Sequence, residues 1–250
     1  IHNLIKSVGG VNNAGTFYDY TTYYEEIPEA KLELAMAIEA DRMRNLELDS
    51  KQFKREKSVV KQERRMRVEN NIFNSAQEEI QAKAFTKSPL KHQIIGWMES
   101  LNQISEAEVK KYYQQYYAPN NAVMVVAGDV QGKEVYNLAQ KYYGDYKPQE
   151  IERLQIAEPP QEKERTVKVR KTTNLPIISL LYKIPEGNHR DIVPIKALMD
   201  IWINNATSRV KRKLKQEERM ILQAGSYTLA LRQPGFVLAY AVPMSEGIVK

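Results

Sequence analysis

The chain has 250 residues, of which 42% are hydrophobic and 27% charged, a balance typical of a folded globular protein. Its 37 basic and 31 acidic side chains give a net charge of +6, an excess too small to indicate nucleic-acid binding by itself. The absence of cysteine excludes disulfides and thiolate metal sites, and only His2, His92 and His189 could supply imidazole.

The N-terminal residues predict two strands followed by a helix. Residues 11–20 and 21–27 are rich in Val, Thr, Tyr and Phe, which favour strands. Pro28 then opens a helix at the first helical position, where proline is favoured. This helix, residues 28–45, carries the following side chains at helical spacing: Leu32, Ala35, Met36, Glu39 and Met43.

The next helix, residues 51–67, places two carboxylates among apolar side chains. At about 100° per residue Glu56 and Glu63 are nearly eclipsed, and the apolar residues within roughly 60° of Glu56 are Phe53, Val59 and Val60. Most basic residues fall to the sides or back: Lys54, Arg55, Lys57, Lys61, Arg64 and Arg65. Because burying an unpaired charge is costly, we expect compensation by Arg67 on the same face, by another segment, or by a metal ion.

Alternating helices and a strand complete the first half. Residues 74–85 predict a helix, and Ser105 with Glu108 forms a capping box at the start of the next one. The apolar run 121–129 predicts a buried central strand, and 133–143 predicts a helix that Gly144 ends. This order of elements predicts an α+β domain with helices packed on a sheet.

A polar segment with three prolines, residues 148–165, predicts a linker between domains. Beyond it, composition and periodicity favour strands at 166–172 and 177–184 and helices at 191–204 and 207–218. Residues 221–231 and 235–242 then predict a hairpin.

An internal repeat relates the two halves. QAGSY at 223–227 resembles NAGTF at 13–17, and AYAVPMSE at 239–246 resembles YYEEIPEA at 23–30, with offsets of 210 and 215 residues. A repeat of this period predicts two related domains. We expect them at 1–147 and 166–250, both truncated.

Four segments carry a resemblance to a known family: GGVNNAGTFYDYTTYY (9–24), EADRMRNLEL (39–48), FKREKSVVKQERRMR (53–67) and YYAPNNAVMVVAGDV (116–130). With these segments in this order, the chain resembles the M16 metallopeptidases, the insulinase, pitrilysin and mitochondrial-processing-peptidase family. The resemblance implies the M16/LuxS-like metalloenzyme fold, with helices packed on mostly antiparallel sheets. It also implies a zinc-dependent endopeptidase that hydrolyses peptides or unfolded polypeptides.

The resemblance assigns roles to both carboxylates. Glu63, in VVKQE, matches the distant zinc ligand of the family, and Glu56 matches a supporting residue that orients groups around the metal. The family's H-x-x-E-H motif, which supplies two imidazoles and the catalytic base, would lie roughly a dozen positions before Ile1. We therefore expect zinc in the full-length enzyme and not in this chain alone.

The resemblance also implies how substrate binds. Asn13, Ala14 and Thr16 match an N-A-x-T edge strand that pairs with an extended peptide, and main-chain hydrogen bonds of this kind depend little on sequence. A second M16-type half, on the same chain or on a partner subunit, is a further expected partner.

Three alternatives stay open at this point. Glu56 and Glu63 could lie on a solvated helix edge, held by salt bridges to arginines such as Arg67. The chain could belong to a non-catalytic M16-like subunit that binds peptides or a catalytic partner. The basic segments 54–67 and 211–215 could contact nucleic acid, but acidic residues interrupt them and no groove-reading motif accompanies them, so we expect no nucleic-acid partner.

Overall fold

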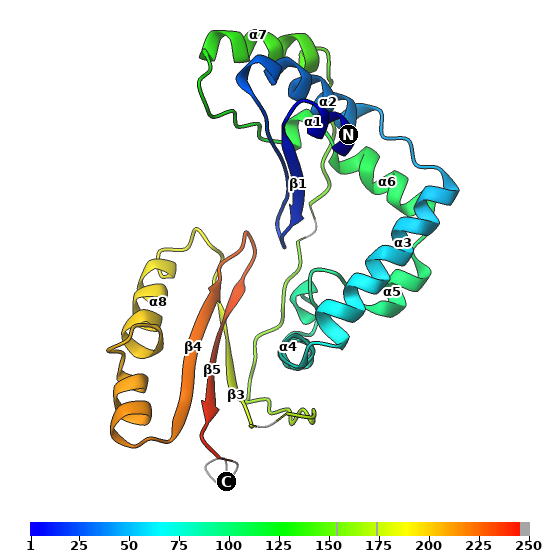
Figure 1. Ribbon diagram of the computed structural model, residues 1–250. Coiled ribbons are helices and arrows are strands. Elements are labelled where there is room, and N and C mark those ends of the chain that lie inside the picture. Colours follow the sequence, from blue (N-terminus) through cyan, green and yellow to red (C-terminus); the bar gives the residue numbers. More distant parts are fainter. Residues whose placement is uncertain (154, 174, 246–250) are drawn as a thin grey trace. The chain divides into compact units, whose positions relative to one another are not determined.

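The structure is a computed structural model that describes residues 1–153, 155–173 and 175–245 (Figure 1). The chain divides into two compact units: unit 1 contains residues 1–62 and 96–155, and unit 2 contains residues 63–95 and 156–250. Both units combine helices with an antiparallel sheet, which agrees with the predicted α+β class. The division into domains at 148–165 remains a prediction.

Unit 1 is built around a two-stranded hairpin. Strand β1 (Val11–Thr16) follows the short helix α1 (His2–Ser7) and pairs antiparallel with β2 (Thr21–Glu26). Only glycine fits at Gly10, because a Cβ there would lie 2.8 Å from the carbonyl oxygen of Glu26. The two strands predicted here are present.

Helices α2 and α7 belong to the same unit as the hairpin (Figure 1). The helix predicted from Pro28 begins as the 3-10 turn η1 (Glu29–Lys31) and continues as α2 (Leu32–Arg44), which packs along α7 (Gly132–Tyr143). Gly144 ends α7 as predicted but in a right-handed conformation. A larger residue would not fit at this position, because a Cβ would lie within 3 Å of the Gln140 backbone.

The remaining helices of the first half run from α3 to α6. Their bounds are α3 Ser50–Arg64, the π-helical turn η2 Arg65–Glu69, α4 Ile72–Ala84, the 3-10 turn η3 Pro89–Lys91, α5 Met98–Gln103, α6 Glu106–Tyr116 and the 3-10 turn η4 Pro119–Asn121. The predicted capping box starts α6: the Ser105 hydroxyl accepts from the Glu108 N–H, and the Glu108 carboxylate accepts from the Ser105 N–H at 2.7 Å.

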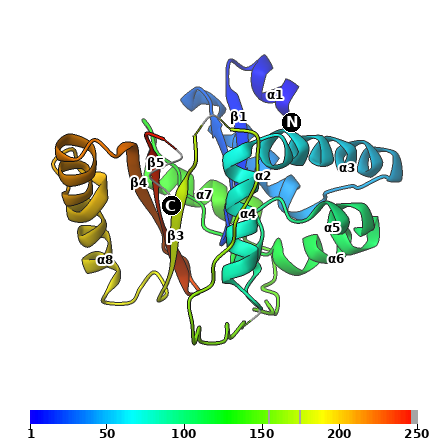
Figure 2. The ribbon, with the colours of Figure 1, turned by 90° about the horizontal axis from the view of Figure 1, so that it is seen from below.

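Unit 2 contains a three-stranded antiparallel sheet in the order β3-β5-β4. Its strands are β3 (Ile178–Ile184), β4 (Ile221–Leu229) and β5 (Gly235–Pro243), and β4 and β5 form the predicted hairpin. Helix α8 (Ile192–Met199) with the π-helical turn η5 (Asp200–Asn204) covers one face of the sheet, and η6 (Lys211–Glu217) follows (Figure 2). The core between them consists of Ile184, Ile192, Met199, Ile203, Ile221, Ala224, Val237 and Ala239.

Helix α4 also packs with the sheet of unit 2. The ring of Phe85, directly after α4, lies 5.9 Å from the ring of Phe236 on β5. The side-chain amide of Gln77 donates to the hydroxyl of Tyr227 on β4. Phe236 and Val237 point to opposite faces because side chains alternate along a strand. The sheet is therefore covered by α8 on one face and contacted by α4 on the other.

Two predicted strands are absent. Residues 121–129 and 166–172 have no strand partner among the described residues, and Val123 and Val125 are 90% and 82% exposed. A strand needs a neighbour to pair its N–H and C=O groups. The prediction of a buried central strand at 121–129 is therefore wrong for the described residues, which supply no partner strand for this apolar segment. No helix in the described part of the chain combines the length and apolar character that a membrane crossing needs.

Candidate functional site

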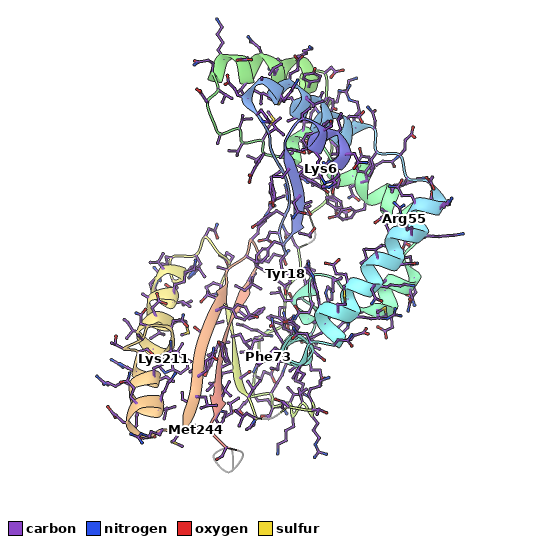
Figure 3. All side chains as sticks on the ribbon, viewed as in Figure 1. Lys6, Tyr18, Arg55, Phe73, Lys211 and Met244 are labelled. Carbon is purple, nitrogen blue, oxygen red and sulfur yellow. The ribbon has the colours of Figure 1, made fainter. Side chains whose placement is uncertain are left out.

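The two carboxylates predicted to face the core are instead partly exposed on α3. The side chain of Glu56 is 53% exposed and lies 3.0 Å from Nη2 of Arg55, which is labelled in Figure 3. The side chain of Glu63 is 37% exposed, and its Oε1 lies 3.1 Å from Nε of Arg67, one turn further along. Val59, between them, is more than half exposed. The predicted buried apolar stripe is wrong, whereas the expected pairing of Glu63 with Arg67 is present.

The buried residue on α3 is Arg64, which the helical projection had placed away from the core. Its guanidinium binds the carboxylate of Glu78 on α4 at two points, with N–O distances of 2.8 and 3.0 Å. Glu69 adds a longer contact at 3.6 Å. A two-point arginine–carboxylate pair is both strong and directional. The end of α3 is therefore fixed by a charge pair, and Glu63 is left on the more open side.

Neither carboxylate belongs to a complete metal site. In residues 1–153, 155–173 and 175–245, no three His, Cys, Asp or Glu side chains lie close enough to hold an ion together. A structural or catalytic zinc site needs at least three protein ligands. The described residues do not fit zinc by themselves, and at this position they offer one carboxylate that is already paired with an arginine.

Each histidine has a contact with a residue close to it in the chain. Nδ1 of His2 lies 2.9 Å from the side-chain oxygen of Asn12, and Nδ1 of His92 lies 2.7 Å from the carbonyl of Gln93. His189 lies within 3.7 Å of Asp191, two residues away. None of the three joins Glu63.

Strand β1 places the predicted substrate residues at a free sheet edge. The Phe17 N–H donates to the Tyr20 carbonyl across the hairpin, so the odd-numbered residues of β1 direct their N–H groups toward β2. The N–H of Ala14 consequently points to the outer edge, where it donates to the side-chain oxygen of Asn13 at 2.9 Å. Among the described residues, β1 pairs with β2 alone. Asn13 therefore covers the hydrogen-bonding position that an added strand would use.

A second cluster of charges, which the sequence analysis did not identify, lies between β2 and α2. Nη2 of Arg42 is 2.9 Å from Glu39 and 3.5 Å from Glu25, and all three side chains are less than one quarter exposed. Burial raises the pKa of Glu39, and the hydrogen bond with Glu25 and the charge of Glu25 raise it further. The charge of Arg42 lowers it, and the resulting pKa is about 8. The signal in the sequence was Glu39 itself, which shares its helical spacing with Met36 and Met43.

In unit 2 a single carboxylate is surrounded by donors. Glu158 accepts hydrogen bonds from the backbone N–H groups of Thr86, Lys87 and Ser88, at 2.8 to 2.9 Å, and from Nζ of Lys183 at 2.9 Å. Burial alone would raise the pKa of Glu158, but these donors outweigh it and lower the pKa to about 2. The predicted linker is therefore tied to the loop after α4.

A pocket of about 720 Å³ lies between residues 156–164 and the end of β3, and no predicted site residue lines it.

Comparisons with known proteins were made on the sequence and on the fold. Residues 1–97 match the family model for insulinase (peptidase family M16), and residues 103–249 match the model for the peptidase M16 inactive domain. The chain is 30% identical over 242 residues to the zinc protease PqqE of Helicobacter pylori, covering 95% of this chain and 54% of that protein. It is 23% identical to the uncharacterized zinc protease YmxG of Bacillus subtilis, covering 93% of this chain and 56% of that protein.

The fold gives the same result. The crystal structure of a protease from Helicobacter pylori superposes with a TM-score of 0.89 at 29% identity, over 98% of this chain and 60% of that one. A putative M16-like peptidase from Alicyclobacillus acidocaldarius superposes with a TM-score of 0.83 at 19% identity, over 99% and 60% of the two chains. The chain spans little more than half the length of these relatives. Two family models that together match nearly every residue confirm the expected family: the chain belongs to peptidase family M16.

Proposed function

We propose that this chain is part of a zinc-dependent endopeptidase that hydrolyses peptides or unfolded polypeptides. Membership of family M16 and the names of its zinc-protease relatives support this proposal. Within the whole protein, Glu63 would supply one carboxylate ligand to zinc, and Glu56 on the same helix would orient groups around it. The other ligands and the catalytic base would come from the H-x-x-E-H motif that the resemblance implies elsewhere in the whole protein, since the described residues bring no three metal-ligating side chains together.

The observation that supports substrate binding most directly is the free edge of β1. The outward N–H of Ala14 is satisfied by the side chain of Asn13, which can turn aside without breaking the pairing with β2. A peptide carbonyl could then take the place of the Asn13 oxygen. Backbone pairing of this kind suits a protease that accepts many sequences, because every peptide offers the same main-chain groups.

A non-catalytic role is the second candidate. The model that matches residues 103–249 describes an inactive M16 domain, and the described residues hold no set of three metal ligands. A subunit of this kind would bind peptides or a catalytic partner through the same β1 edge and would need no zinc.

Metal analysis of the whole protein separates the two candidates. For the peptidase, Glu63→Gln should remove bound zinc and abolish peptide hydrolysis, because an amide is a poor replacement for a ligating carboxylate. The matched control, Glu99→Gln on α5, changes an exposed carboxylate remote in sequence and should leave both unchanged. Zinc content and activity that survive Glu63→Gln would rule out the assignment of Glu63. A wild-type protein that binds peptide without zinc would support the non-catalytic candidate.

Peptide binding through the edge of β1 has its own test. A fluorescent extended peptide should lose most of its binding when alternate backbone nitrogens are methylated, since each methyl group removes a main-chain donor. A peptide of scrambled sequence serves as the control and should bind nearly as well as the original. Equal binding of the methylated and unmethylated peptides would exclude strand pairing as the main mode.

A further inference from the structure

The cluster between β2 and α2 places two carboxyl groups, those of Glu25 and Glu39, beside one guanidinium, that of Arg42. Nη2 of Arg42 contacts both carboxyl groups, at 2.9 Å from Glu39 and 3.5 Å from Glu25. The side chain of Glu25 is only 8% exposed. The oxygen of each carboxyl that faces Nη2 is Oε1, and neither Oε1 is aligned for a hydrogen bond with a described residue. Nε of Arg42 is also buried without one. The geometry therefore leaves the cluster short of positive charge and of donors.

The elements packed around the cluster do not correct this shortage. Tyr23 on β2 lies under the Arg42 guanidinium at 4.5 Å, and its hydroxyl bonds to that of Tyr117 at the end of α6. Burial raises the pKa of Tyr143 on α7, and the charge of Glu39 raises it further, to about 12. The Tyr143 phenol therefore stays neutral near pH 7. Among the described residues, Arg42 is the cation whose charge acts on Glu39.

Two neighbouring carboxylates out of water cannot both ionise cheaply, so one of them keeps a proton. We propose that Glu25 and Glu39 share one proton, that the shared proton holds β2 on α2 beside Arg42, and that its loss loosens the β1–β2 hairpin. The proton supplies the donor that the pair otherwise lacks. Without it, two negative charges face a single guanidinium in a largely dry site.

The pair would thereby position the edge of β1. In the hairpin register Asn12 lies opposite Glu25, and Ala14 lies opposite Tyr23, whose ring packs on Arg42. Any movement of β2 away from α2 would carry β1 with it. We also expect peptide binding to weaken as the hairpin loosens, and this expectation rests on the proposed function. The expected response of the hairpin to pH is independent of the proposed function.

The pH window follows from the direction of the shift. The pKa of Glu39 is raised from its ordinary 4.5 to about 8, so the folded hairpin binds more protons than the opened one between these values. The stabilisation of the folded hairpin by the bound proton is complete below pH 4.5. It is lost as the pH rises toward 8 and is absent above pH 8. The other shifted carboxyl groups, Glu33, Glu106, Glu108 and Glu158, have lowered pKa values and act below this window.

Amide hydrogen exchange of the full chain, followed by mass spectrometry, tests the proposal. Protection factors of β1 and β2, corrected for the intrinsic pH dependence of exchange, should fall about tenfold per pH unit between about pH 5.5 and 7.5 and level off above about 8.5. Glu39→Gln, which keeps the shape and is always neutral, should remove this slope. Glu25→Gln should do the same, because either amide leaves a single ionisable group beside Arg42.

Controls separate the shared proton from a merely structural role. Glu33→Gln changes an exposed carboxylate on the same helix and should keep the wild-type slope. Strands β4 and β5 of unit 2 serve as an internal reference for folding in every variant. Carboxyl carbon NMR of the wild-type chain should show one glutamate titrating near pH 8. A flat wild-type profile, a slope that persists in Glu39→Gln, or no such titration would overturn the proposal. Peptide binding that fails while the slope is present would instead count against the function of β1.

Discussion

The two units treat buried carboxylates in opposite ways. In unit 1, Glu25 and Glu39 share the single guanidinium of Arg42, and neither Oε1 atom is aligned for a hydrogen bond with it. In unit 2, Glu158 receives three backbone N–H groups and Lys183, and Glu78 receives both terminal nitrogens of Arg64. The pKa of Glu39 is accordingly raised to about 8, and that of Glu158 is lowered to about 2.

The difference shows that burial alone does not decide the charge of a carboxyl group. Burial raises the pKa in both places, and the number of donors decides whether that effect is reversed. A fully satisfied carboxylate such as Glu158 fixes a loop over a wide pH range. We expect the less well satisfied Glu39, with its raised pKa, to respond to pH near neutrality. We expect variants of the two units to differ accordingly.

The largest effect is expected for Arg64→Met in unit 2. The substitution leaves the Glu78 carboxylate buried without its main partner, which should cost about 3–5 kcal/mol in the free energy of unfolding. Urea denaturation would measure it. The double variant Arg64→Met with Glu78→Leu removes both charges and should recover most of the loss. A small loss in the single variant would mean that water replaces the guanidinium and that the pair is not as dry as the structure indicates.

Glu158→Gln should have the next largest effect. The pKa of Glu158 is lowered from its ordinary 4.5 to about 2, so ionisation stabilises unit 2 above pH 4.5 and this stability is lost as pH falls toward 2. At pH 7 the variant should lose about 2–3 kcal/mol. It should also lose the part of the acid dependence between pH 4.5 and 2 that Glu158 contributes, while Glu33, Glu106 and Glu108 keep theirs. Glu162→Gln, an exposed change in the same segment, is the matched control. An unchanged acid profile in Glu158→Gln would show that the donors do not act on this carboxylate.

Much of the local structure could be predicted from the sequence, because it depends on neighbouring residues. The Ser105–Glu108 capping box and the hairpins of both units required only residues close in the chain. Burial of α3 could not be predicted in the same way. Periodicity indicates which residues share a face, but the buried face was set by Glu78, fourteen residues beyond Arg64. The run at 121–129 failed for the same reason, since its composition could not provide a partner strand.

In the candidate site, too, features that depend on neighbouring residues could be predicted and features that depend on packing could not. The strand at 11–16 followed from local composition and the pairing of Glu63 with Arg67 from local spacing, and both are present in the structure. The assignment of Asn13, Ala14 and Thr16 to substrate binding came from the family resemblance and stays a prediction. The Glu25–Glu39 pair joins a strand to a helix and was visible only as an acidic residue among methionines on one helical face. Charge clusters that join separate elements depend on how those elements pack, which composition and spacing do not specify.

The smallest effect on stability is expected for Glu63→Gln, and this small value is informative. The carboxylate is more than one third exposed and its bond to Arg67 is an ordinary pair one turn apart, so the chain should lose less than about 0.5 kcal/mol. Urea denaturation of this chain should therefore hardly distinguish the variant from wild type, in contrast to Arg64→Met one residue away. If the same substitution removes zinc from the whole protein, the loss cannot be attributed to unfolding. If it destabilises the chain as strongly as Arg64→Met, then Glu63 has a structural role and its effect on zinc would no longer identify a ligand.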